Sequence, residues 1–190
     1  MRSSVLAGAV VLLMAAASFG GDITGKVSGV SGSSVVWIES PAKPSHPDKH
    51  FMMDQKGLAF QPHVLIVPVG ATVDFRNSDS VGHNVFWTAI SGDKKLGHNL
   101  GTWPQGESKS FTFTHSGVVP LLCNVHPEMA GYIIVSPTPY AAETDTSGNF
   151  EIKDVPDGKY QVMAWTEGSK PQAKAVTVSG KTNVNFELGK

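Results

Sequence analysis

The chain has 190 residues, with 15 Lys and Arg against 16 Asp and Glu, and a formal net charge of −1. This near-neutral balance provides no basic surface for nucleic acid, and 41% hydrophobic with only 16% charged residues argues against a disordered chain. The single cysteine, Cys123, excludes an internal disulfide framework and any metal site that needs several thiolates.

The first 20 residues have the pattern of a secretory signal peptide. Arg2 is followed by the apolar run 5–17 and then by small residues. The uncharged stretch 3–21 is also close to the length of a membrane span, so a retained membrane anchor is the alternative. We expect residues 1–20 to be removed, which leaves a periplasmic or secreted protein without a stable membrane span.

Short strands separated by turn residues are predicted along the rest of the chain. Apolar and polar residues alternate in these segments, whereas helical periodicity is almost absent. The predicted strands are 23–27, 34–39, 63–67, 72–76, 85–87, 110–114, 118–122, 132–135, 149–152, 160–165, 175–178 and 184–188. So many short strands predict an all-β protein, and the length is sufficient for two β-sandwiches.

Two proline-containing breaks divide the chain. The segment 40–49 has three prolines and cannot continue a central strand, and Ser136-Pro-Thr-Pro139 is the second break. The region between them contains six of the seven histidines and Cys123. The chemistry of the protein is therefore expected in this middle region.

A metal-binding pattern follows the predicted strand 118–122. Cys123, His126 and Met129 form the spacing C-x-x-H-x-x-M on one loop, and a second imidazole, His83, follows the turn-forming run 77–82. Two imidazoles, one thiolate and a weak axial thioether are the donor set that suits copper in electron transfer. The pattern predicts one type 1 copper per chain.

Each of these four residues also has an ordinary structural explanation. A lone cysteine is most often a small buried apolar residue, and Met129 alone is more often a residue that fills gaps in a core. His126 alone is more often a surface imidazole, and the alternative for His83 is a bond to a turn carbonyl. Only their joint arrangement predicts a metal site.

The middle region resembles the cupredoxins, the blue-copper fold of plastocyanin and amicyanin. The matching segments are Val67-Pro-Val-Gly-Ala-Thr-Val-Asp-Phe-Arg-Asn77, His83-Asn-Val85, Gly117-Val-Val119 and Cys123-Asn-Val-His-Pro-Glu-Met-Ala-Gly-Tyr-Ile-Ile-Val135. The resemblance implies a Greek-key β-sandwich over residues 50–136, with His83, Cys123 and His126 as equatorial ligands. Met129 would be the axial ligand, although the short loop leaves open another donor or none.

The same resemblance implies roles around the ligands. Asn84 would bond the backbone near Cys123 and so connect the two ligand segments, or else simply cap a turn. The edge of His126, with Pro127 and Val85 nearby, would be the place where electrons enter and leave.

The ends of the chain resemble a second family. Thr144-Asp-Thr-Ser-Gly-Asn-Phe-Glu-Ile152 and Val155-Pro-Asp-Gly-Lys-Tyr160 are similar to the signature of carboxypeptidase regulatory-like β-sandwich domains, whose opening strands match 23–27 and 35–38. The resemblance implies a discontinuous domain, 22–42 plus 137–190, into which the cupredoxin is inserted. Alternatively, the N-terminal strands pack on the cupredoxin and leave a short C-terminal sandwich.

These observations favour an exported one-electron carrier that exchanges electrons with redox proteins that the sequence does not identify. A copper-binding or copper-delivery protein without a redox partner is the alternative. An enzyme is not expected, because Cys123 is flanked by Leu122 and Asn124 rather than by the histidines of a multicopper oxidase. A binuclear copper centre would need a second thiolate.

Overall fold

The computed structural model describes residues 20–39 and 50–189. The predicted signal peptide and the proline-rich segment 40–49 lie outside the described residues, except for Gly20, which begins the first strand. In the described part of the chain, no helix is long and apolar enough to cross a membrane.

The prediction of an all-β protein is confirmed. The elements are β1 (Gly20–Ser28), β2 (Ser34–Glu39), β3 (His50–Gln55), β4 (Phe60–Gln61), β5 (Val64–Pro68), β6 (Thr72–Asn77), β7 (His83–Trp87), the 3-10 helix η1 (Lys94–Leu96), β8 (His98–Trp103), β9 (Ser108–Thr112), β10 (Gly117–Leu122), β11 (Ala130–Ser136), β12 (Ala141–Glu143), β13 (Asn149–Pro156), β14 (Gly158–Thr166), β15 (Gln172–Val178), β16 (Thr182–Asn183) and β17 (Phe186–Glu187).

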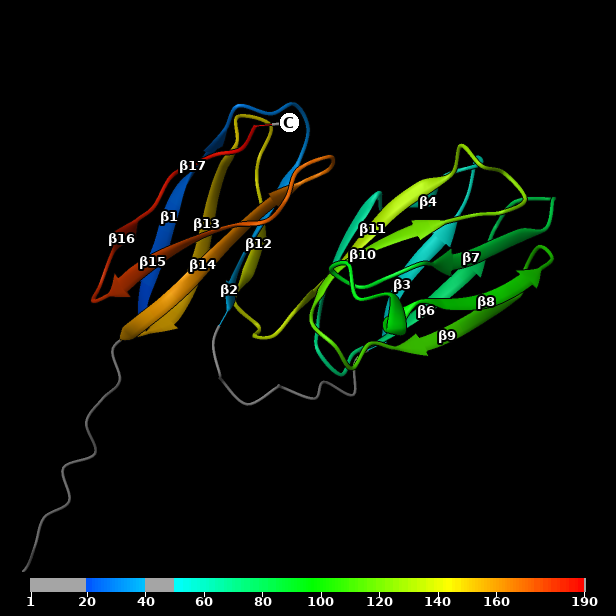
Figure 1. Cartoon of the computed structure of the whole chain (residues 1–190), viewed down its shortest axis with the longest axis horizontal. Helices are drawn as coiled ribbons and strands as arrows, with labels where there is room; N and C mark the ends of the chain where they lie inside the picture. Colours follow the sequence, from blue (N-terminus) through cyan, green and yellow to red (C-terminus); the bar gives the residue numbers. More distant parts are fainter. Residues whose placement is uncertain (1–19, 40–49, 190) are drawn as a thin grey trace, which may run out of the picture.

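The strands form four sheets, arranged as two sandwiches that lie side by side (Figure 1). The central sandwich consists of a five-stranded sheet, β5-β11-β10-β7-β8, and a four-stranded sheet, β4-β3-β6-β9. The flanking sandwich consists of the sheet β12-β2-β14-β15 and a sheet in which β1 pairs with β13, β16 and β17.

The flanking sandwich contains strands from both ends of the described chain. β1 runs antiparallel to β13, with Ile23 opposite Ile152. β2 lies between β12 and β14, with Trp37 opposite both Ala141 and Met163. The N-terminal strands therefore pair with strands that follow them by more than 100 residues, across the whole central sandwich (Figure 1).

Each sandwich has its own apolar core, formed by the inward-facing side chains that alternate with outward-facing ones along the strands. In β6, Val73 and Phe75 are buried while Asp74 and Arg76 face outward, as expected for a strand with one covered face. The large residues of the central core include Trp87, Trp103 and Phe113. This core lies directly behind the end of the sandwich that carries the predicted ligands.

A third apolar layer joins the two sandwiches. One sheet of the flanking sandwich packs on the central sandwich through a cluster of four buried side chains. The flanking sandwich contributes Val35, Trp37 and Trp165, and the central sandwich contributes Ile134. The first five residues of β2 are all buried because both faces of the strand are covered. Val36 and Ile38 face the core of the flanking sandwich, whereas Val35 and Trp37 face the layer between the sandwiches. The relative position of the two sandwiches is thus fixed by packing rather than by a tether.

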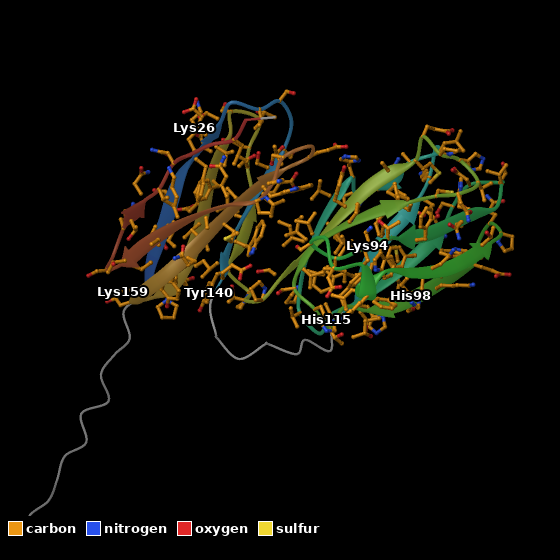
Figure 2. The ribbon with its side chains drawn as sticks, in the orientation of Figure 1. Lys26, Lys94, His98, His115, Tyr140 and Lys159 are labelled. Atoms are coloured by element: carbon orange, nitrogen blue, oxygen red, sulfur yellow. The ribbon has the colours of Figure 1, made fainter. Side chains whose placement is uncertain are left out.

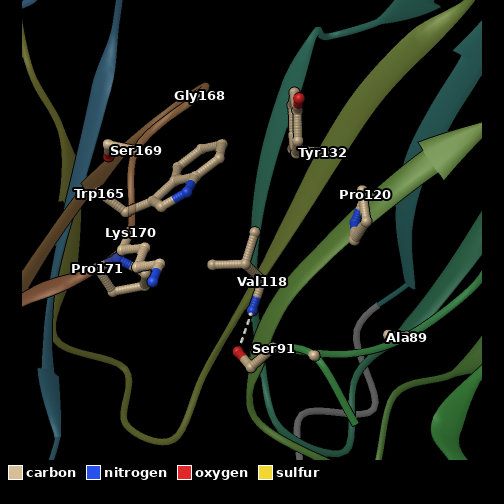
Figure 3. A pocket seen from close by; sticks show the side chains of 11 residues that line it. Ala89, Ser91, Val118, Pro120, Tyr132, Trp165, Gly168, Ser169, Lys170 and Pro171 are labelled. Carbon is tan, nitrogen blue, oxygen red and sulfur yellow. Dashed lines mark hydrogen bonds between the residues drawn. The ribbon is translucent and has the colours of Figure 1, made fainter. Parts of the chain in front are cut away.

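A groove of about 730 Å³ borders this layer (Figure 3). Its walls are formed by both sandwiches and contain Ala89, Ser91, Gly92, Val118, Pro120, Tyr132, Trp165, Gly168, Ser169, Lys170 and Pro171. Polar contacts also cross between the sandwiches: the Tyr132 hydroxyl donates to Glu167 Oε1 at 3.1 Å, and His63 Nε2 lies 2.8 Å from Glu167 Oε2.

Candidate metal centre

Strand pairing brings the separate predicted ligand segments together. β7 and β10 are antiparallel neighbours, with Phe86 opposite Leu122. The start of β7, at His83, therefore lies beside the end of β10, where the chain continues into Cys123. His83 directly follows the turn-forming run 77–82 and is the first residue of β7.

The loop after β10 folds back through a tight turn. The Met129 amide donates to the His126 carbonyl at 3.0 Å, which closes a four-residue turn with Pro127 in its second position. Proline favours this position because its fixed φ matches the turn geometry. The turn places His126 and Met129 at the same end of the sandwich as Cys123.

Three of the four predicted ligands lie close together. His83, Cys123 and His126 each offer a ligand atom, and these atoms lie within 4.8 Å of one another. The two imidazole rings are in edge contact, with 3.1 Å between their Nδ1 atoms. His83 and Cys123 are buried and His126 is half-buried, so the site is closed on one side and reaches solvent through His126.

Met129 lies at the base of the same region. Its side chain is buried in the central core, in the cluster that also contains Cys123. A buried thioether beside a thiolate is compatible with a weak axial donor and equally with core packing.

Hydrogen bonds from Asn84 connect the ligand segments. The Asn84 backbone amide donates to Cys123 Sγ at 3.4 Å, and the Asn124 amide donates to Asn84 Oδ1 at 3.4 Å. The Asn84 side-chain amide donates to Asn99 Oδ1 on β8 at 2.9 Å. The prediction that Asn84 bonds the backbone next to Cys123 is confirmed.

Asp79 is a site residue that sequence reasoning missed. Asp79 Oδ2 lies 2.9 Å from Nε2 of His83, on the far side of the ring from His126. Backbone hydrogen bonds, that from Leu58 first and then that from Gly57, together with the bond to His83, hold the pKa of Asp79 below its ordinary value against the opposing effect of burial. The signal in the sequence was an aspartate four residues before a candidate ligand histidine.

The exposed end of the site carries several apolar side chains. Four large apolar side chains are exposed among the described residues, and three of them lie on segments tied to the ligands: Val125 on the ligand loop, Val81 just before His83, and Leu58, whose amide bonds Asp79. Val85 is fully buried in the central core. Its predicted place at the electron port is therefore wrong, because it lies on the inward face of β7.

The remaining described histidines lie away from this cluster. β7 and β8 are antiparallel neighbours, with His83 opposite Trp103 at one end of the pair and Trp87 opposite His98 at the other. His98 is therefore at the end of this strand pair away from His83. Its ring packs on Trp87 and Phe111. His98 is the first residue of β8. His98 and His115 both belong to the central sandwich (Figure 2).

Two family models match parts of the chain. Residues 48–136 match the copper binding proteins of the plastocyanin/azurin family, which supports a cupredoxin domain in the middle of the chain. Residues 130–185 match domain II of polysaccharide lyase family 4, which makes a second β-sandwich domain plausible.

Solved structures similar to this chain include variants of amicyanin and a purple cupredoxin. One Cu(I) structure of an amicyanin variant has 24% identity and covers 53% of this chain and 98% of its own, with a TM-score of 0.43. A second variant, in the reduced Cu(I) form at pH 4, has 27% identity with the same coverage and TM-score. A novel purple cupredoxin from Nitrosopumilus maritimus has 26% identity and covers 45% of this chain and 99% of its own, with a TM-score of 0.41.

The residues present fit a copper ion. The two Nδ1 atoms face each other, Cys123 Sγ lies beside them, and Nε2 of His83 is already engaged by Asp79. Two imidazoles and one thiolate form the trigonal donor set of copper electron-transfer proteins. Together with the family match, this donor set supports a copper protein.

Proposed function

We propose that this protein is an exported type 1 copper protein that carries one electron at a time between redox proteins. His83, Cys123 and His126 hold the ion, and Met129 is its axial ligand. Bound copper supplies the Cu(II)/Cu(I) couple, and the chain supplies a site whose shape is compatible with both states. The signal-peptide pattern of residues 1–20 supports export.

The observation that carries the proposal is that three donors from two separated segments come together, two of them buried and His126 half-buried. Their ligand atoms lie within 4.8 Å of one another. The Asn84 amide donates to Cys123 Sγ, and Asp79 accepts a hydrogen bond from the ring of His83. A site held from outside its ligands changes little between oxidation states, which favours electron transfer over release of the metal.

We assign the rest of the chain to a discontinuous sandwich domain, 22–42 plus 137–190, around the cupredoxin domain 50–136. The pairing of β1 with β13 and of β2 with β14 supports this division. The buried layer around Trp37 and Trp165 supports a structural role for the flanking sandwich. It covers the outer face of the sheet that carries Cys123.

The test is to load the mature chain with copper and to measure its visible absorption, spin resonance and reversible potential. A carrier gives an intense blue or purple colour, reversible one-electron voltammetry and slow loss of copper to a chelator. Colourless copper, or copper that a chelator removes within seconds, contradicts the carrier and supports the delivery alternative.

Replacing Met129 by Leu tests the axial assignment. Loss of a thioether donor disfavours Cu(II), so we expect the colour to remain and the reduction potential to rise by about 59 mV, which is a tenfold change in relative affinity for a one-electron couple. Met53→Leu is the matched control, since Met53 is a buried methionine in the same core. Equal potentials in both variants would show that Met129 is a core residue only.

Replacing Val125 by Asp tests the apolar surface around His126. Val125 is 46% exposed on the ligand loop. A charge there must lose water when an apolar partner surface docks, so we expect bimolecular electron transfer to slow by about tenfold, or about 1.4 kcal/mol, at an unchanged potential. Met52→Asp, at 54% exposed and outside the ligand segments, is the control. An equal loss of electron-transfer rate in both variants would show that redox partners do not dock on the surface around His126.

A further inference from the structure

Asp79 gathers three N–H donors on one carboxylate. Oδ1 accepts the Gly57 amide at 2.7 Å, while Oδ2 accepts both the Leu58 amide and His83 Nε2, each at 2.9 Å. Asp79 itself is fixed by Asn77, whose side-chain oxygen accepts the Asp79 amide at 2.9 Å. The carboxylate therefore links the turn between β3 and β4 to the ring of a predicted ligand.

This arrangement decides which nitrogen of His83 is free. An ionised carboxylate can only accept hydrogen bonds, so Nε2 of His83 must carry a proton. With Nε2 of His83 donating to Asp79, Nδ1 is the nitrogen of that ring that faces His126 Nδ1, 3.1 Å away.

His126 is held differently. Among the described residues, its Nε2 has no hydrogen-bond partner, and its ring is half-buried rather than buried. The site thus has one imidazole fixed by a carboxylate inside the protein and one that is free to face a partner. Fixing a ligand's outer N–H normally raises its basicity and metal affinity.

We propose that Asp79 is a positioning residue of the copper site: its carboxylate fixes His83 with Nδ1 toward the metal, and its negative charge favours Cu(II) over Cu(I). The inference rests on the proposed copper function. It adds to the three ligands a fourth side chain, from the turn before β7, and makes the Gly57–Leu58 turn part of the site.

Two substitutions of Asp79 separate its effect on the orientation of the His83 ring from the effect of its negative charge. In Asp79→Asn, the amide oxygen can still accept from Leu58 and His83, while its NH2 replaces the oxygen that faced Gly57. The His83 tautomer is then kept and the charge is lost. Asp79→Ala removes both. The two variants should therefore differ in ring orientation and agree in the direction of the potential shift.

The first measurement needs no metal. Long-range nitrogen–proton NMR of the metal-free protein reports the tautomer of each histidine. We expect His83 to be protonated at Nε2 in the wild type and in Asp79→Asn, and to be a mixture of tautomers in Asp79→Ala. A His83 that keeps one tautomer in Asp79→Ala would overturn the positioning role.

The second measurement uses the copper-loaded protein. We expect Asp79→Asn to shift the ratio of Cu(II) to Cu(I) affinity about tenfold toward Cu(I), which raises the potential by about 59 mV. Asp79→Ala should in addition lower copper affinity by about 10- to 100-fold and change the spin-resonance spectrum. Wild-type potential and spectrum in Asp79→Asn would overturn the charge effect.

Asp74→Asn is the matched control. Asp74 also bonds a histidine, His50 Nδ1 at 2.8 Å, but that pair lies on β3 and β6, and His50 is at the end of β3 away from the Gly57–Leu58 turn. We expect this variant to leave the His83 tautomer and the potential unchanged. Colourless copper in the wild type would contradict the proposed function alone, because the metal-free NMR measurement still decides the role of Asp79.

Discussion

We expect the replacement of Cys123 by Ser to abolish the visible colour of the copper-loaded protein. The intense absorption of a type 1 site arises from charge transfer between thiolate and copper, and Cys123 supplies the only thiolate in the chain. We expect complete loss of the visible band and a fall in copper affinity, because soft sulfur is the donor that holds Cu(I). Absorption and spin resonance of equal copper-loaded samples measure the effect.

Two controls accompany this variant. Serine is close to isosteric and can still accept the Asn84 amide, so near-ultraviolet circular dichroism should show an intact core. His115→Ala removes an exposed histidine outside the metal cluster and should keep the colour. A visible band that survives in the serine variant would contradict the type 1 site.

Replacing Trp165 by Ala separates the unfolding of the two sandwiches. Trp165 is buried between them, with its ring 4.9 Å from that of Tyr132. Large-to-small changes at such positions cost about 3–5 kcal/mol. Because this cost falls on the shared layer, we expect one cooperative urea transition in the wild type. In the variant, the loss of the copper-dependent absorption and the loss of the flanking-sheet signal should become two transitions.

Trp87→Ala is the control for this effect. Trp87 is equally buried but belongs to the central core alone. Its loss should lower the unfolding free energy by a similar amount, with the central sandwich as the first to unfold, and leave the shared layer intact. Identical unfolding behaviour of the two variants would show that the sandwiches are not coupled through Trp165.

Much of the strand content was readable from the sequence. Alternation in Thr72–Asn77, with Val73 and Phe75 inward, predicts a half-buried strand without any knowledge of its neighbours. By contrast, His98–Trp103 has no clear alternation, so β8 was missed. Its strand character comes from pairing with β7.

The candidate site was predictable to different degrees. The spacing of Cys123, His126 and Met129 lies within one turn, where sequence distance limits spatial distance. Asp79 lies only four residues before His83, so its nearness to that ligand was readable from the sequence. Leu58 has no such signal, because it reaches the site through a hydrogen bond between two turns that are separated in the chain. Val85 was misplaced because a strand residue beside a ligand can face either way, and the register turns it inward.

The amino-acid sequence determined what depends on near neighbours: the all-β class, the turn that carries the predicted ligands, and the absence of any second thiol. Tertiary structure alone decided which strands are neighbours, and therefore that His83 meets Cys123, that Asp79 holds the outer nitrogen of His83, and that Trp37 and Trp165 lie between the sandwiches. The physical reason is that side-chain alternation and turn preference act over a few residues. Sheet order and the packing of one sheet on another depend on the whole chain at once.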